Sequence, residues 1–186
     1  MIHQTVKAII DNVNDFIKLK FRVEEPKVIF SNLVNQDGSV PSTNNNKIIC
    51  SLINIEQEQL RSAGAFMTSG KGAKNPPIDL KLNLMFSSSY TEDNYAEGLR
   101  FLALVIGFFQ GKTVFTPANT PRLPSYLKQI TITMYSLEMN NLSNLWGAIG
   151  AKYMPSTIYQ LKVISFFENM MLDEVSEIGT IDSSIE

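Results

Sequence analysis

The sequence predicts an α/β (α+β) fold: a single domain in which a mixed or antiparallel β-sheet of about five strands is flanked by two main helices. Three observations lead to this prediction. Apolar residues recur at helical spacing near residues 2–19 and 92–110, whereas apolar and polar residues alternate strictly over 78–86. The chain has 186 residues, of which 44% are hydrophobic, and this is enough for one buried core. We therefore assign residues 1–168 to the domain and residues 169–186 to an acidic C-terminal tail.

The first third of the chain is expected to hold one helix and two strands. The apolar positions of residues 2–19 predict an amphipathic helix, and Pro26 closes the connection that follows it. Alternating β-branched residues predict strands at 27–34 and 48–55. The polar loop between these strands contains Asp37-Gly38, a dipeptide typical of tight turns.

Residues 56–75 form a polar, glycine-bearing stretch that we interpret as an exposed loop or a flexible arm. Pro76 and Pro77 end this loop, and the strict alternation of 78–86 then predicts a half-buried strand. Three cations of the loop are candidate contacts for an acidic partner: Arg61, Lys71 and Lys74.

The second main helix is expected to begin after Thr91, because threonine caps helix N-termini and Glu92 and Asp93 follow in the first turn. In the second half of this helix, apolar residues occupy every face. A helix that is apolar all round is buried, either in the core or between subunits. One apolar face is expected to consist of Tyr95, Leu99, Leu102, Ile106 and Phe109.

The last third of the chain is expected to contain a short strand at 113–115 and longer strands at 127–137 and 157–167. The proline-fixed stretch 116–124, which includes Arg122, is predicted to be a loop. From Glu168 onward the chain carries acidic residues and no basic one, which is typical of a solvated end or of a segment docked on a partner.

A short amphipathic turn between these strands carries the only tryptophan, Trp146. Leu142, Leu145 and Ile149 flank it at helical offsets, which favours a place in the core. The alternative is an interface anchor, because tryptophan is enriched at binding hot spots. The sequence leaves both interpretations open.

The sequence contains no recognisable catalytic set. His3 is the only histidine, so a histidine-based triad would have to recruit a residue at the extreme N-terminus, and we interpret His3 as a surface helix residue. One histidine and one cysteine, Cys50, cannot form a zinc cluster. We interpret Cys50 as a buried small hydrophobe in a reducing compartment. Fragments 64–72 and 107–113 resemble a phosphate-binding loop, but the glycine spacing is wrong in both. We expect no enzymatic activity, no cofactor and no metal.

Composition also bounds the partners. The net charge of −2 gives no global field that attracts nucleic acid. The longest apolar run, 101–109, is far shorter than the roughly 20 residues of a membrane helix, and the N-terminus lacks a secretory pattern. We expect assembly in the cytoplasm, without nucleic acid binding or membrane insertion.

Three stretches of the chain carry a family likeness: 75–90, 95–115 and 137–164. Together they resemble the N-terminal domain of the cap, or tail-terminator, proteins of phage-tail-like contractile injection systems of the antifeeding-prophage type. The motif residues of this resemblance are Asn75, Pro76, Arg100, Phe101, Phe109, Leu145, Trp146, Gly147 and Pro155.

The resemblance implies a fold similar to phage tail terminators and a structural cap that binds the distal end of the inner tube and sheath. Such a cap ends polymerisation and fastens the sheath to the tube. The implied partners are further copies of the chain in a hexameric ring, the sheath protein and the inner-tube protein. After cytoplasmic assembly the chain would be part of an injection particle. The first alternative is a baseplate or sheath-associated adaptor of the same particle, and a remote one is a small nucleotide-binding enzyme.

Assembly contacts are expected in the loops 56–75 and 116–124 and in the acidic tail, because these segments are predicted to be exposed. The candidate binding residues are Arg61, Lys71, Lys74, Arg122, Trp146, Asp173 and Glu174.

Overall fold

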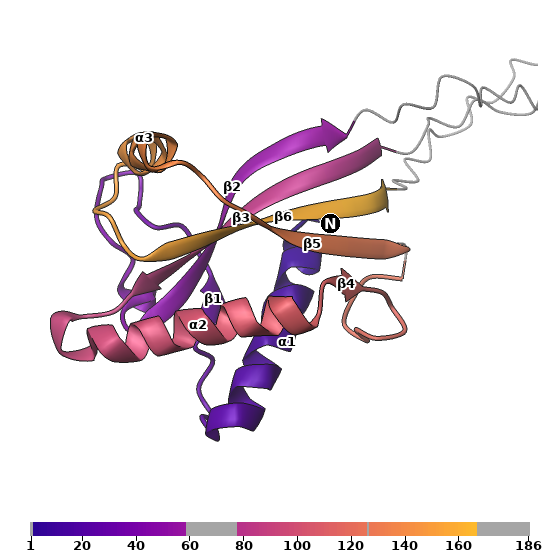
Figure 1. Ribbon diagram of the computed structural model, residues 1–186, viewed down its shortest axis with the longest axis horizontal. Helices are drawn as coiled ribbons and strands as arrows, with labels where there is room; N and C mark the ends of the chain where they lie inside the picture. Colours follow the sequence, from indigo (N-terminus) through magenta and orange to yellow (C-terminus); the bar gives the residue numbers. More distant parts are fainter. Residues whose placement is uncertain (1, 59–77, 126, 167–186) are drawn as a thin grey trace, which may run out of the picture.

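The computed structural model describes residues 2–58, 78–125 and 127–166, which contain three α-helices and six strands (Figure 1). The predicted α+β class is confirmed: each of the six strands overlaps an expected range, close to the predicted total of about five, and α3 is a helix beyond the two main ones expected. Two short 3₁₀ helices, η1 (Ser42–Asn44) and η2 (Glu92–Asn94), complete the set. The elements are α1 (Ile2–Phe21), β1 (Val28–Phe30), β2 (Lys47–Glu58), β3 (Ile78–Ser89), α2 (Tyr95–Gly111), β4 (Val114–Phe115), β5 (Gln129–Tyr135), α3 (Met139–Ile149) and β6 (Ser156–Phe166).

The strands form one mixed sheet in the order β1-β2-β3-β6-β5-β4. Only β1 and β2 pair in parallel, and the other neighbours are antiparallel. Helices α1 and α2 cover one face of the sheet, while α3 lies on the other face near one end (Figure 1). The sheet therefore has a covered face, a small second core under α3, and a stretch without a helical cover.

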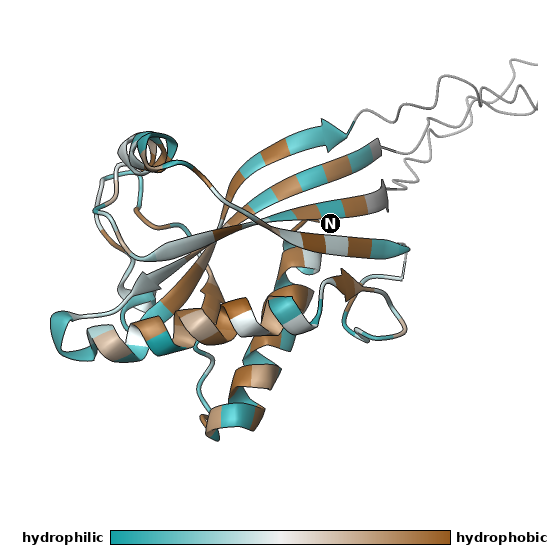
Figure 2. Cartoon of the chain, in the orientation of Figure 1, coloured by the Kyte–Doolittle hydropathy of each residue, from teal (hydrophilic) through white to brown (hydrophobic). Residues whose placement is uncertain are grey.

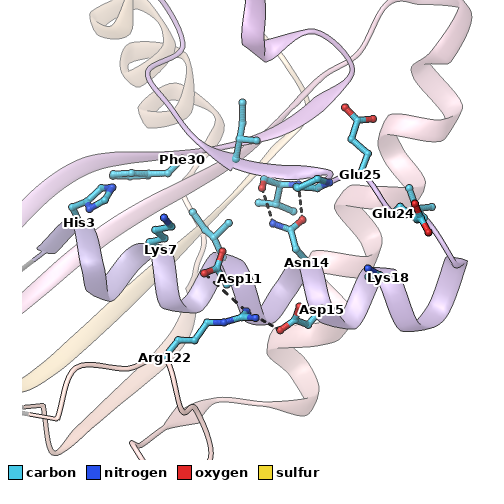
Figure 3. Close-up of a pocket in the computed structure, with 15 residues that line it drawn as sticks. His3, Lys7, Asp11, Asn14, Asp15, Lys18, Glu24, Glu25, Phe30 and Arg122 are labelled. Atoms are coloured by element: carbon cyan, nitrogen blue, oxygen red, sulfur yellow. Dashed lines mark hydrogen bonds and ion pairs between the residues drawn. The ribbon is translucent and has the colours of Figure 1, made fainter.

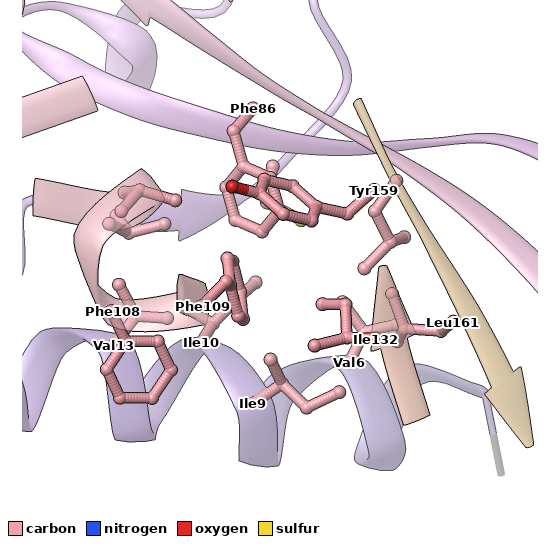
Figure 4. Close-up of a cluster of buried hydrophobic side chains, with 14 of the residues drawn as sticks. Val6, Ile9, Ile10, Val13, Phe86, Phe108, Phe109, Ile132, Tyr159 and Leu161 are labelled. Carbon is pink, nitrogen blue, oxygen red and sulfur yellow. The ribbon is translucent and has the colours of Figure 1, made fainter. Parts of the chain in front are cut away.

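The main core lies between the sheet and helices α1 and α2 (Figure 4). On α1 the buried residues recur every three or four positions, which is the spacing that keeps one helical face towards the sheet. Aromatic rings fill the centre, where the Phe109 ring lies 4.6 Å from that of Tyr159 and 5.4 Å from that of Phe86. Cys50 is fully buried in this core, as predicted.

The buried face of α2 differs from the predicted one. Tyr95 and Leu99, expected to face the core, are 50% and 39% exposed. The helix also begins later than expected, because Glu92–Asn94 form a 3₁₀ turn that starts after Thr91. Leu102 and Phe109 belong to the buried face as expected. That face consists of Gly98, Phe101, Leu102, Val105, Phe108 and Phe109.

Gly98 allows α2 to approach the end of β3 closely. A Cβ atom at this position would clash with the Ser88 hydroxyl and lie 2.7 Å from Tyr90 Cγ. Gly107 lies on the exposed face of the same helix, and an added Cβ there would have no atom within 4 Å. One helix therefore holds one glycine required by packing and one that packing does not require.

We expect Gly98→Ala to lower the free energy of unfolding by about 1–2 kcal/mol, because the clash outweighs the gain in helix propensity. Gly107→Ala in the same helix is the matched control and should raise stability by up to about 1 kcal/mol. Urea denaturation followed by circular dichroism measures both changes. An increase in stability for Gly98→Ala would contradict the close packing of α2 on β3.

Strand β3 is buried more deeply than its alternating sequence predicts. It lies at the centre of the sheet, and every residue from Leu82 to Ser88 is buried. The even-numbered apolar residues face α1 and α2, while Met85 on the other face packs in the second core under α3. The alternation of side chains between the two faces of this strand was correctly predicted. The second face is buried because α3, which is distant in sequence, packs on it.

The expected short turn around Trp146 is the helix α3, which extends over eleven residues from Met139 to Ile149. The helix includes Gly147 and ends at Gly150, whose φ of 74° provides a left-handed C-cap. Trp146 is 4% exposed and packs with Leu33, Ile49, Met85 and Ile158. The interpretation of Trp146 as a core residue is therefore confirmed.

The first strand is shorter than predicted, since only Val28–Phe30 of the expected 27–34 pairs with β2. Residues after it form a hydrogen-bonded loop instead. Gly38 has a φ of 79° and donates to the Asn35 carbonyl, which confirms the predicted Asp37-Gly38 turn. Strand β2, by contrast, continues to Glu58, so residues 56–58, expected in the exposed loop, belong to this strand.

Candidate assembly surface

The open face of the sheet is polar beyond α3. Side chains alternate between the two faces of each strand, so residues on this face are every second one along β2, β3 and β6. Figure 2 shows this alternation of hydrophilic and hydrophobic residues towards the strand ends. A shift of register between Leu52 and Asn54 turns the acidic residues of β2 onto the same face.

Cross-strand hydrogen bonds connect these polar side chains into a ladder, which we call the polar ladder: Glu56, Glu58, Lys81, Asn83, Gln160 and Lys162. Asn83 Nδ2 donates to Glu56 Oε1 at 2.7 Å, and Gln160 Nε2 donates to Asn83 Oδ1 at 3.2 Å. Two residues further along β2, Glu58 Oε1 accepts from Lys162 Nζ at 2.9 Å and lies 3.3 Å from Lys81 Nζ. The ladder fixes side chains of three strands on an open surface.

The hydrogen bond from Lys162, with support from Lys81, lowers the pKa of Glu58 below its ordinary value of 4.5. A lowered carboxyl pKa stabilises the fold above the ordinary value, and this contribution is lost as pH falls through the folded-state value. We expect Glu58→Gln to be less stable than the native chain at pH 7 by up to about 1 kcal/mol. This difference should shrink below pH 4.5. Urea midpoints at stepped pH values measure it, and a difference that persists at low pH would contradict the assigned pairing.

The end of the polar ladder is also where two undescribed segments attach. Glu58 pairs with Asp79 and Ile78 pairs with Phe166, so the ends of β2 and β6 and the start of β3 are neighbours. Residues 59–77 and 167–186, which leave from this edge, lie outside the described residues. Their candidate contacts and motif residues therefore stay predictions: Arg61, Lys71, Lys74, Asn75, Pro76, Asp173 and Glu174.

A second polar surface is the groove between α1 and the edge strand β1, with a volume of about 610 Å³ (Figure 3). Arg122, a predicted contact residue, lies at this groove. Its Nη1 is 2.9 Å from Asp15 Oδ2 and 4.0 Å from Asp11 Oδ2. These ion pairs attach the predicted loop 116–124 to α1 and leave the guanidinium largely exposed.

Asn14 occupies the outer edge of β1 in this groove. Its Oδ1 accepts from the main-chain N–H groups of Lys27 and Val28 at 3.0 and 2.9 Å, while its Nδ2 donates to the Val28 carbonyl at 2.8 Å. The carboxamide thus satisfies both main-chain groups that Val28 presents away from the sheet. Strand addition at this edge is blocked at that position.

Lys112, the lysine of one apparent phosphate-binding fragment, is engaged within the protein. Its Nζ donates to Asn12 Oδ1, the Asn119 carbonyl and Thr120 Oγ1 at 3.0, 2.9 and 3.1 Å, and lies 4.8 Å from the Phe115 ring centroid. Burial lowers the pKa of Lys112. The fragment also ends a helix instead of starting one, so the lysine fastens α1 to the loop after β4.

Other groups that could carry chemistry are dispersed. His3 is exposed on α1, and burial raises the pKa of the Cys50 thiol far above its ordinary value. Over residues 2–58, 78–125 and 127–166, no three His, Cys, Asp or Glu side chains are grouped so that they could hold a metal ion. No helix in those ranges is long and apolar enough to span a membrane.

The described motif residues divide between core and surface. Phe101, Phe109 and Trp146 are buried, and Leu145 packs partly against the second core. Pro155 is half-buried and its carbonyl accepts from the Ser88 N–H at 2.9 Å. Arg100 and Gly147 are exposed, and the Arg100 guanidinium lies 5.8 Å from the Phe21 ring centroid. A direct contact of Trp146 with a partner stays a prediction.

Sequence reasoning missed the polar ladder and Asn14. The alternation of Lys81 and Asn83 in a predicted strand marked them as residues of one face. Nothing local indicated that Gln160 and Lys162 would lie beside them, because β6 is far from β3 in the sequence and becomes its neighbour only in the folded sheet.

The fold and the surface define a mixed-sheet α+β domain with two cores and an open polar face beyond α3. The chain belongs to the family described as the Pvc16 N-terminal domain, whose family model matches residues 4–173. This confirms the family resemblance of the sequence.

Two solved structures are similar to this chain. A PVC sheath/tube terminator of an extracellular contractile injection system, in its extended state, has 16% identity and a TM-score of 0.48 over 95% of this chain and 63% of that chain. The anti-feeding prophage tube-terminating cap has 18% identity and a TM-score of 0.46, over 94% of this chain and 61% of that chain. The chain thus spans 63% and 61% of the lengths of these two structures. No curated protein matches the chain.

Proposed function

We propose that this chain is a structural cap domain of a contractile injection particle. It binds the distal end of the inner tube and sheath, ends their polymerisation and fastens one to the other. The observation that carries this proposal is the membership of residues 4–173 in the Pvc16 N-terminal domain family. A hexameric ring of this chain would suit a sixfold tube end.

The sheet edges support a terminating role. The edge strands β1 and β4 have three and two residues, and Asn14 occupies the outward main-chain groups of Val28. Short and blocked edges offer little opportunity for another strand to add. The polar ladder is then the surface that meets the last ring of tube or sheath subunits, and no reaction is catalysed there.

Particle length tests this proposal. A strain that lacks the chain is expected to form tubes of uncontrolled length or particles with detached sheaths in electron micrographs. Normal tube lengths without a baseplate would instead support the adaptor alternative. Reintroduced Lys81→Glu/Lys162→Glu should restore length control poorly, whereas Lys152→Glu, an exposed lysine outside the ladder, is the matched control and should restore it fully.

A further inference from the structure

The C-terminal end of α1 is an exposed, basic and apolar projection. Leu19 is 83% exposed and Phe21 42% exposed, so two large apolar side chains reach solvent in the last turn of the helix. The last turn of α1 carries lysines and no acid, and the Arg100 guanidinium lies over the Phe21 ring. We call this surface the α1 tip: Lys18, Leu19, Lys20, Phe21, Arg22 and Arg100.

The α1 tip ends in a fixed conformation. Arg22 has a φ of 53°, a left-handed conformation that is uncommon for a residue with a Cβ, and its N–H donates to the Lys18 carbonyl at 2.9 Å. Phe21 is held 6.2 Å from the Phe101 ring on α2. The helix thus ends in a closed main-chain turn, with the Phe21 ring packed beside α2.

The charge of the α1 tip is not balanced by its surroundings. Asp15 pairs with Arg122, while Glu25 pairs with Lys27 and Lys47. Glu24 and Glu97 are the nearby carboxylates without an ion pair among the described residues, against four cations of the tip. The surface therefore favours a partner that is acidic and carries apolar side chains.

The chain itself contains a segment of this chemistry. Residues 167–186 hold six acidic side chains and no basic one, interspersed with methionine, leucine, valine and isoleucine. We propose that the α1 tip binds the acidic segment 167–186 of a neighbouring copy of this chain. The acidic residues of this segment are Glu168, Asp173, Glu174, Glu177, Asp182 and Glu186.

The architecture favours a contact between copies over one within a chain. Phe166 pairs with Ile78 at the start of β3, whereas the tip contacts Phe101, which stacks on Tyr90 just after the end of β3. The twelve residues of β3 therefore separate the two points by about 40 Å. Bridging this distance within one chain would use about twelve fully extended residues and leave only Asp182 and Glu186 to bind.

A tip at one end and an acidic segment at the other form a heterologous pair of surfaces. Repeated head to tail, such a contact closes into a ring or continues as a filament. The inference deepens the proposed function, since it rests on a cap that assembles from copies of this chain. The binding test of this inference needs neither tube nor sheath. It also changes other residues than the particle-length experiment does, so the inference and the proposed function can fail independently.

The first test measures binding of a fluorescent synthetic peptide of residues 167–186 to the full chain. The chain carries Asp173→Asn, Glu174→Gln and Glu177→Gln to weaken competition from its own segment. We expect saturable binding that weakens about tenfold or more between about 50 and 500 mM salt. Lys18→Glu/Lys20→Glu should weaken it at least as much, whereas Lys152→Glu should leave it unchanged. No binding, or binding unaffected by the tip substitutions, overturns the proposal.

A second test distinguishes neighbouring copies from one chain. One full chain carries Lys18→Glu/Lys20→Glu with a native acidic segment, and the other carries a native tip with the three neutralised acidic residues. Each alone should sediment as a monomer, and the mixture should give a one-to-one dimer. A monomeric mixture overturns the contact between copies. Circular dichroism checks that the variants are folded, and the gentler Lys18→Gln/Lys20→Gln should show a smaller loss of peptide binding.

Discussion

Trp146→Ala is expected to lower the free energy of unfolding by about 3–5 kcal/mol. The indole is 4% exposed and is the largest side chain of the small core between α3 and the sheet. An isolated helix of eleven residues is not stable in water, so α3 depends on this packing. We expect α3 to detach from the sheet in this variant, with an early loss of helical signal in urea denaturation.

Two further substitutions show which property of Trp146 is required. The indole Nε1 is buried without a hydrogen-bond partner among the described residues. Trp146→Phe removes this group as well as some volume, so it should cost less than alanine, about 1–3 kcal/mol. Tyr153, whose ring lies 5.6 Å from Trp146 but which is 65% exposed, is the control, and Tyr153→Ala should change stability by no more than about 0.5 kcal/mol.

The same series tests the second interpretation of Trp146. If Trp146→Ala kept native stability and impaired association between copies, the residue would be an interface anchor. If Trp146 is a core residue, Trp146→Ala should instead lower the stability of the monomer. Because burial under α3 is complete within one chain, we expect the second outcome.

The elements with a strong local pattern were correctly predicted. Period two over 78–86 identified β3, and helical spacing identified α1 to within a few residues. The two-residue strand β4 also lies within the short strand expected at 113–115. The predictions for β1 and α3 were less accurate, since β1 is only three residues long and α3 continues through a glycine. At Gly147 the packing of Trp146 and its neighbours outweighs the low helix propensity of glycine.

The candidate surface could be predicted only in part, because it depends on contacts distant in sequence. The Glu58–Lys162 pair joins residues 104 apart, and the Arg122–Asp15 pair joins residues 107 apart. Alternation places a side chain on one face of a strand but does not say which strand lies next to it. The candidates in residues 59–77 and 167–186 were chosen for charge, and they remain predictions.

Phe109→Ala is expected to be as damaging as Trp146→Ala, at about 3–5 kcal/mol. Phe109 on α2 lies at the centre of the main core, where its ring is within 5.4 Å of three other rings. Truncation leaves a cavity that α2 cannot close, because Gly98 already holds this helix against Tyr90 near the end of β3. Urea denaturation should therefore show a lower midpoint with an unchanged slope.

Two comparisons make the Phe109 result specific. Phe21→Ala removes the same side chain from an exposed position and should cost less than about 1 kcal/mol. Combining Phe109→Ala with Tyr159→Ala should cost less than the sum of the single changes, because the rings lie 4.6 Å apart and aromatic pairs couple by about 0.5–1.5 kcal/mol. Additive losses would mean that the two rings act independently, and α2 would then be held to the sheet by separate contacts and not by one aromatic cluster.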